Sequence, residues 1–111
     1  MLDVLIEVRG TWVRHQQALL MRSLGMVVST ALGFHPSAAL VRIHHLDQEE
    51  FLAPDGAGDR FIRVEASLLS TTKLEARIAV RQAITECLMR FDVPFKDMRI
   101  VVRTDCEGVF A

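Results

Sequence analysis

Three of the four segments predicted as strands place apolar residues at every second position, which is the period of a β-strand with one buried face. In the first segment, for example, Val4, Ile6 and Val8 are separated by Leu5 and Glu7. The pattern predicts strands over residues 2–8, 40–46, 61–69 and 98–103.

Two longer segments between these strands place apolar residues at helical spacing. The first predicts a helix over about 13–32 that ends at Gly33 and Pro36, because glycine terminates helices and proline prevents their continuation. Its apolar stripe is Leu20, Leu24, Val27, Val28, Ala31 and Leu32.

The second helix follows the third strand and ends at the sequence Asp92-Val93-Pro94. Thr72 and Glu75 predict a capping box at its start, and Glu86 and Arg90 have the spacing of an exposed ion pair. Its predicted apolar stripe is Leu74, Ile78, Ala83, Ile84, Cys87, Leu88 and Phe91.

The order of elements repeats along the chain. Pro36 and Pro94 are 58 residues apart, and each stands four residues before an apolar strand residue, Leu40 or Met98. We therefore predict an α+β fold that duplicates one β-α-β unit, in the order βαββαβ.

The two pseudo-repeats are residues 1–46 and 60–103, within a single domain over 1–111. Right-handed crossovers place both helices on one face of a four-stranded mixed sheet. The residues predicted beneath the helices are Val4, Ile6, Ile62, Val64, Ala66, Met98, Ile100 and Val102.

The opposite face of the sheet is predicted to be highly charged. From three strands it receives Asp3, Glu7, Arg63, Glu65, Arg99 and Arg103. The second strand contributes either Arg42 and His44 or Val41, Ile43 and His45. Taken alone, the charges favour a solvated face; the alternative is a compensated interior of an oligomer, where arginines also collect anions.

Composition narrows the class of protein. Half of the 111 residues are hydrophobic and 24% are charged, which argues against disorder, and the net charge of −1 gives no reason to expect nucleic acid or an anionic membrane as a partner. Apolar runs are too short for a membrane span, and Asp3 and Glu7 exclude a signal peptide. We expect a cytoplasmic protein.

The two cysteines do not indicate a disulfide scaffold or a metal site. Cys87 lies on the apolar stripe of the second helix, so we interpret it as a core residue. Cys106 lies between Asp105 and Glu107, whose charges disfavour a thiolate nucleophile. Nothing resembles a phosphate-binding glycine loop, a zinc site or a nucleophile–His–acid arrangement. We predict no metal and no cofactor.

The stretch 91–103, FDVPFKDMRIVVR, resembles the helix end, proline turn and second strand of the short 4-oxalocrotonate tautomerases. It continues into Gly108-Val109-Phe110, where those enzymes have a glycine and a pocket phenylalanine. The run 41–47, VRIHHLD, is more similar to 5-carboxymethyl-2-hydroxymuconate isomerase, a relative of duplicated length. The resemblance to the tautomerase superfamily covers nearly the whole chain.

This resemblance implies a homotrimer whose sheets close around a central barrel. It also implies an active site in which an amino-terminal proline of low pKa acts as general base on a small enolisable acid. Nearby arginines hold the substrate carboxylate and stabilise the enolate.

Carried over by position, Arg99 matches the arginine that binds the substrate carboxylate, and Phe110 matches the pocket aromatic. The helix-start arginine falls at Thr71 in the second unit and near Trp12 or Val13 in the first, where Arg14 is close enough to substitute.

Leu2 occupies the place of the catalytic proline. Because leucine is too large for ordinary methionine removal, we expect Met1 to remain. Its α-amine, with an ordinary pKa of about 7.7–8.0, is then the remaining weak candidate base.

Several other residues keep two interpretations each. Arg99 either binds a carboxylate or belongs only to the charged face. Arg42 and His44 share one face of a strand, and His44 is either an acid–base group or structural. Trp12 is either a core plug or a pocket wall. The acidic connector over 47–59 is a solvated loop or a lid.

Three functional hypotheses follow. The leading one is a tautomerase-like protein, a keto–enol isomerase of a small enolisable carboxylate with low or altered activity. The second is a non-enzymatic trimeric binding protein that has lost the catalytic base. The third is an unrelated ferredoxin-like binding domain, which has the same order of elements.

Overall fold

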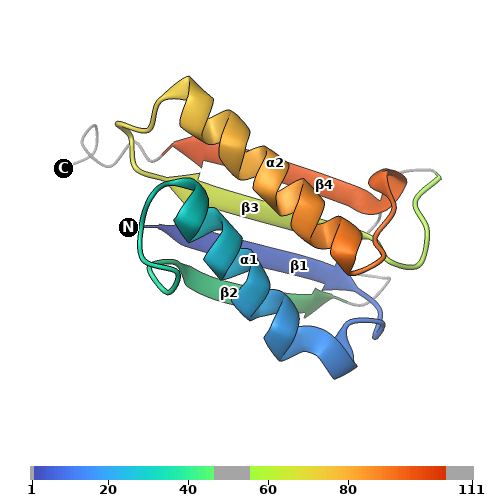
Figure 1. The fold of residues 1–111 in the computed structure, drawn as a ribbon. Coiled ribbons are helices and arrows are strands. Elements are labelled where there is room, and N and C mark those ends of the chain that lie inside the picture. The colour runs from blue at the N-terminus through green and yellow to red at the C-terminus, as the bar shows by residue number, and fades with distance from the viewer. Residues whose placement is uncertain (1, 47–55, 105–111) are drawn as a thin grey trace.

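The computed structural model describes residues 2–46 and 56–104 of the chain (Figure 1). Its strands are β1 (Asp3–Arg9), β2 (Leu40–Leu46), β3 (Ile62–Leu68) and β4 (Met98–Thr104). Its helices are α1 (Gln17–Ala31) and α2 (Leu74–Arg90), with short 3₁₀ turns η1 (Arg14–Gln16) and η2 (Phe95–Asp97). The order of elements is the predicted βαββαβ.

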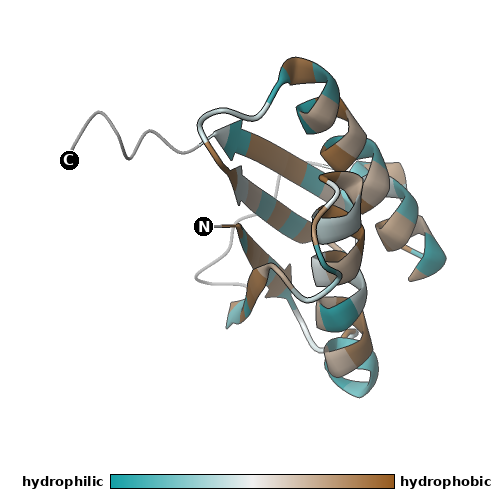
Figure 2. Cartoon of the chain, turned by 60° about the vertical axis from the view of Figure 1, so that its left-hand side comes forward, coloured by the Kyte–Doolittle hydropathy of each residue, from teal (hydrophilic) through white to brown (hydrophobic). Residues whose placement is uncertain are grey.

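The four strands form one sheet in the order β2-β1-β3-β4. The pairs β1–β2 and β3–β4 are parallel, as two β-α-β crossovers require, while β1 and β3 pair antiparallel in the centre. Both helices lie on one side of this mixed sheet and leave its other side uncovered (Figure 2). The predicted fold class is therefore confirmed.

The core lies between the helices and the inner face of the sheet. Val4, Ile6 and Val64 are fully buried there, together with Leu24 of α1 and Leu88 of α2. Burial of each such side chain contributes roughly 1.5–3 kcal/mol relative to exposure. On the edge strand β4 the predicted inner residues, Met98, Ile100 and Val102, are partly buried and pack against this core.

The register between β1 and β2 decides which residues of β2 face the helices. Leu5 lies opposite Arg42 and Glu7 opposite His44. Neighbours in register point to the same face, so Arg42 and His44 belong to the open face. The inner face of β2 carries Val41 and Ile43, which pack against the core, and His45, which contacts Gln17 of α1 at 2.6 Å.

Close approach of α1 to β2 depends on a glycine. A Cβ atom built on Gly25 would lie 2.8 Å from Cγ2 of Val41, closer than atoms pack. The helix therefore rests directly on the strand at this position.

The start of each helix differs from its prediction. Arg14–Gln16 form a 3₁₀ turn, so α1 begins at Gln17 rather than near 13. The predicted capping box is wrong: the backbone N–H of Thr72 donates to the carbonyl of Leu69 at 3.0 Å, and this turn makes Lys73 the N-cap, without a side-chain cap.

Two further expectations for α2 are wrong. Leu74 and Ile78 are 60% and 57% exposed, because this end of α2 lies over the edge strand β4 and they line a shallow groove beside Val102. Glu86 accepts a hydrogen bond from Gln82 at 3.3 Å and is not paired with Arg90 among the ion pairs of the described residues.

Within residues 2–46 and 56–104, neither helix has the length and apolar character needed to cross a membrane.

Candidate functional site

Ion pairs connect three strands on the open face of the sheet. Arg63 of β3 donates to Glu7 and to Glu65, each at 2.9 Å. Arg103 also reaches Glu65, at 3.1 Å. The hydrogen bond to Glu65 contributes most to raising the pKa of Arg63 above its already high ordinary value, despite opposing desolvation, so this guanidinium is permanently charged. The opposite charges at the centre of the open face thus compensate one another in a lattice of ion pairs.

Arg99 stands beside this lattice without a carboxylate of its own. It lies directly opposite Arg63 in the parallel β3–β4 register. Its side chain is exposed, and within the described part of the chain it belongs to no ion pair. A free guanidinium beside a second arginine suits an anionic ligand.

The other predicted residues of the open face lie at the opposite edge. Arg42 pairs with Asp3 at 3.0 Å, and His44 lies opposite Glu7 on the outer strand β2. Three strand spacings, about 14 Å, separate β2 from β4. One subunit therefore does not bring Arg42 or His44 to Arg99. Met1 and Phe110 lie outside the described residues.

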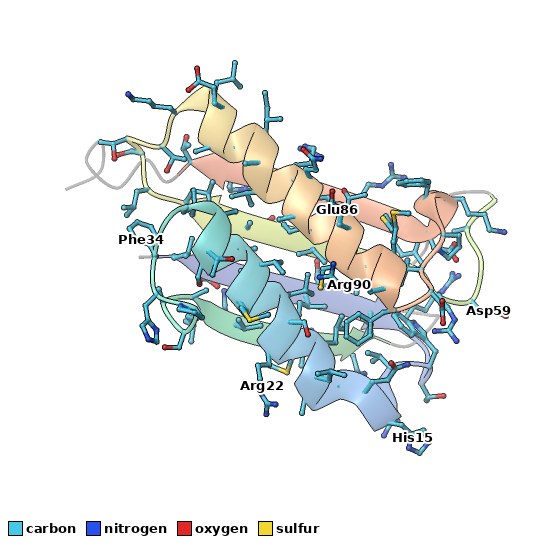
Figure 3. All side chains as sticks on the ribbon, in the orientation of Figure 1. His15, Arg22, Phe34, Asp59, Glu86 and Arg90 are labelled. Carbon is cyan, nitrogen blue, oxygen red and sulfur yellow. The ribbon has the colours of Figure 1, made fainter. Side chains whose placement is uncertain are left out.

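A separate cavity lies at the start of β1. Because β1 and β3 are antiparallel, with Asp3 opposite Ser67, the chain leaving β3 passes beside the N-terminal end of β1. The cavity there has a volume of about 510 Å³. Its lining includes apolar Leu32, Phe34 and Leu69 and polar Thr71, Thr72 and Lys73. Figure 3 shows Phe34 beyond the end of α1, at one end of the sheet.

Lys73 provides the positive charge of this cavity. It is the N-cap of α2, and no side chain caps the first turn of the helix. Glu75 also lines the cavity and partly offsets the ammonium charge. Apolar walls, hydroxyl groups and one cation suit a small carboxylate with an apolar body.

Sequence reasoning missed Lys73. The predicted capping box assigned the start of α2 to Thr72, and matching by position assigned the helix-start arginine to Thr71, which does line the cavity. The positively charged residue, Lys73, lies two positions after Thr71. A signal was present in the sequence, since Lys73 is the basic residue of this strand–helix junction.

The corresponding junction of the first unit lies at the other end of β1. Val13 is fully buried in the core. Trp12 is partly buried, packs against the core and lines a smaller, separate cavity of about 250 Å³. Arg14 is exposed in η1.

Cys87 is a core residue, as predicted. Its side chain is buried, and desolvation raises the pKa of its thiol, which the charge of Arg90 only partly opposes. Across the described ranges, no group of three or more His, Cys, Asp or Glu side chains is placed to hold a metal ion.

No protein-family model and no curated protein matches the chain. Solved structures do. Fused 4-OT, as a wild-type symmetric trimer, superposes with a TM-score of 0.79 at 14% identity, over 93% of this chain and 85% of the other. FG41 malonate semialdehyde decarboxylase, inhibited by 3-bromopropiolate, gives a TM-score of 0.79 at 16% identity, over 92% and 82%.

Macrophage migration inhibitory factor from Toxoplasma gondii is also similar, with a TM-score of 0.76 at 16% identity over 98% of this chain and 94% of that one. All three structures have the architecture of the tautomerase superfamily. At such low identity the likeness establishes the fold, and it extends over almost the whole chain. The protein therefore has the fold of the tautomerase superfamily.

Proposed function

We propose that the protein is a tautomerase-like keto–enol isomerase of a small enolisable carboxylate, with low or altered activity. The observation that carries this proposal is the cavity of about 510 Å³ at the end of β3, where Lys73 lies with the apolar side chains of Leu32, Phe34 and Leu69. Among the structural neighbours, FG41 malonate semialdehyde decarboxylase is inhibited by 3-bromopropiolate, itself a small unsaturated carboxylate.

In this proposal each residue of the cavity has a separate role in holding or converting the substrate. The Lys73 ammonium holds the substrate carboxylate, Thr71 and Thr72 supply hydroxyl donors, and the apolar wall at Phe34 packs against the carbon skeleton. The α-amine of Met1 is the weak base. A charge-assisted hydrogen bond to the carboxylate is worth about 1.5–3 kcal/mol.

Residues of the open face enter the proposal through a homotrimer. Arg99 on β4 is too far from Arg42 and His44 on β2 to act with them in one subunit, so we propose that neighbouring subunits bring these residues, with Phe110, toward the substrate. The fused 4-OT neighbour is a symmetric trimer. Sedimentation equilibrium tests the assembly: a mass of three chains supports it, and a monomer or dimer contradicts it.

Ketonisation of phenylenolpyruvate or 2-hydroxymuconate tests the activity. We expect a rate above buffer that falls about tenfold or more in Lys73→Gln, and that also falls in Arg99→Ala. Lys96→Gln is the matched control, because Lys96 is an exposed lysine of η2. No rate above buffer, or equal rates in wild type, Lys73→Gln and Arg99→Ala, would contradict the proposal.

A second candidate function is a non-enzymatic trimeric protein that binds an anionic metabolite. The observation that favours it is Leu2, a residue without a basic group at the position of the catalytic proline, with its side chain buried in the core. The variant Leu2→Pro discriminates between the two. Activity that appears only in this variant means that the pocket is preserved and the base has been lost.

A further inference from the structure

The repeated order of elements creates two similar corners in the fold. In each unit the first strand turns into a helix, and a cavity lies at that turn: the one at Lys73 in the second unit, and the one at Trp12 in the first. Because β1 and β3 run antiparallel, the corners lie at opposite ends of the sheet. Figure 3 shows this separation through Phe34 at one end and Asp59 at the other.

The corner at Trp12 contains an arginine that the backbone holds in place. Arg9, the last residue of β1, donates from Nη2 to the carbonyl oxygen of Gly58 at 2.9 Å. The N–H of Gly58 in turn donates to the carboxylate of Asp97, which is only 2% exposed. A Cβ on Gly58 would lie 3.0 Å from Oδ2 of Asp97, so a larger residue would crowd this carboxylate. The chain Asp97–Gly58–Arg9 fixes the guanidinium at the edge of the cavity.

Trp12 forms one wall of the same corner. The Cζ atom of Arg60 lies 5.2 Å from the centre of its ring, which is the geometry of a cation–π contact. Arg60 is itself anchored by donating to the carbonyl of Phe91 at 3.3 Å. The indole Nε1 of Trp12 is buried and has no hydrogen-bond partner among residues 2–46 and 56–104. Buried donors are normally satisfied, so the corner lacks an acceptor.

Two arginines lie at this corner, Arg9 at the cavity and Arg60 over the ring of Trp12. Within residues 2–46 and 56–104, neither Arg9 nor Arg60 belongs to an ion pair. The acidic side chain that lines the cavity is Asp59, and it is exposed. An anion in the cavity would therefore meet the anchored guanidinium group of Arg9, opposed by the exposed carboxylate of Asp59 and, behind Gly58, by the buried carboxylate of Asp97.

We infer that this corner is a second binding pocket, which takes a small carboxylate between Arg9 and Trp12. Its volume of about 250 Å³ restricts the ligand to a small molecule. Arg9 supplies the charge-assisted donors, and the indole supplies a flat apolar wall. The strand that starts beside this pocket is β3, because Val8 lies opposite Ile62. Since β3 begins in mid-chain, the pocket has no terminal amine, and its role is to bind and not to isomerise.

Trp12 makes the pocket directly observable, because the chain contains one tryptophan and no tyrosine. Benzoate is a suitable probe: titration into the full chain should change the tryptophan fluorescence with saturation. Arg9→Gln should weaken binding about tenfold or more, the loss expected for a charge-assisted contact, whereas Arg9→Lys should restore part of it. Asp59→Asn should tighten binding, because it removes the opposing charge.

The other cavity provides the matched control. Lys73→Gln alters only the cavity at the start of β1, so its fluorescence titration should equal that of wild type even if its isomerase activity is lost. The inference is overturned if quenching by benzoate is linear, or if Arg9→Gln binds as wild type does. If Arg9→Gln does not fold, Asp59→Asn decides: tighter binding supports the pocket, and unchanged affinity overturns it.

Discussion

Arg63 and Arg99 lie directly opposite each other on the neighbouring strands β3 and β4. Glu7 and Glu65 compensate the charge of Arg63, each at 2.9 Å. Arg99 has no such partner in the described part of the chain. Like charges directly opposite on a sheet are destabilising, so a free Arg99 weakens the subunit unless an anion or a neighbouring subunit compensates it.

Removal of the charge of Arg99 should therefore leave the subunit as stable or more stable. We expect Arg99→Gln to change the free energy of unfolding by about 0.2–1 kcal/mol in the stabilising direction, measured by urea unfolding. Arg103→Gln is the control on the same strand, because it removes a contact with Glu65 instead of a repulsion. Stabilisation by Arg103→Gln and loss of stability in Arg99→Gln would contradict this account.

The packing of α1 on β2 predicts that Gly25→Ala changes the free energy of unfolding in opposite directions in the wild type and in a Val41→Ala background. Gly25→Ala should lower the free energy of unfolding, because overpacking against Val41 costs about 1–3 kcal/mol and exceeds the gain of about 1 kcal/mol in helix propensity. In a Val41→Ala background the contacting methyl group is absent. Gly25→Ala should then be stabilising. If it destabilises both backgrounds equally, the close contact is not the cause.

Burial of Cys87 predicts a dependence of stability on alkaline pH. Because burial raises the pKa of its thiol in the folded state, the thiol stays protonated there while the unfolded thiol ionises above its ordinary pKa of about 8.5. The unfolded state then binds fewer protons, so stability falls as pH rises, by up to about 1.4 kcal/mol per pH unit.

Urea unfolding of wild type and Cys87→Ala between about pH 8 and 10 measures this effect. The variant lacks the thiol, so its stability should fall less steeply with pH, whatever its stability at neutral pH. If the free energy of unfolding falls equally steeply with pH in the two proteins, Cys87 does not contribute to the pH dependence.

The contact between Asp97 and Gly58 predicts that its removal lowers the stability of the fold. Asp97→Ala leaves the N–H of Gly58 without its acceptor, which should lower the free energy of unfolding by about 1–3 kcal/mol. Lys96→Ala changes the exposed neighbour and should stay within about 0.5 kcal/mol of wild type. Thermal or urea unfolding compares them, and equal stability of the two variants would be inconsistent with the contact.

The elements of the fold follow from local patterns in the sequence. Alternation over 2–8 predicts a strand, which the structure has at Asp3–Arg9, because a strand with one buried face needs apolar residues at every second position. The same period assigned Val4, Ile6 and Val64 to the face under the helices, where they are fully buried. Helix starts were less predictable, because the turn at Thr72 and Leu69 competes with a side-chain cap.

Tertiary structure decided which residues of β2 belong to the open face and which residues line the cavities. Alternation alone could not choose between Arg42 and Val41 for the open face, since a shift of one residue exchanges the faces of a strand; the pairing of Glu7 with His44 made the choice. Lys73 became a candidate only because antiparallel pairing of β1 and β3 brings the start of one unit beside the helix start of the other. Sequence determined the elements because hydrophobic periodicity is local, whereas the two cavities depend on contacts between residues distant along the chain.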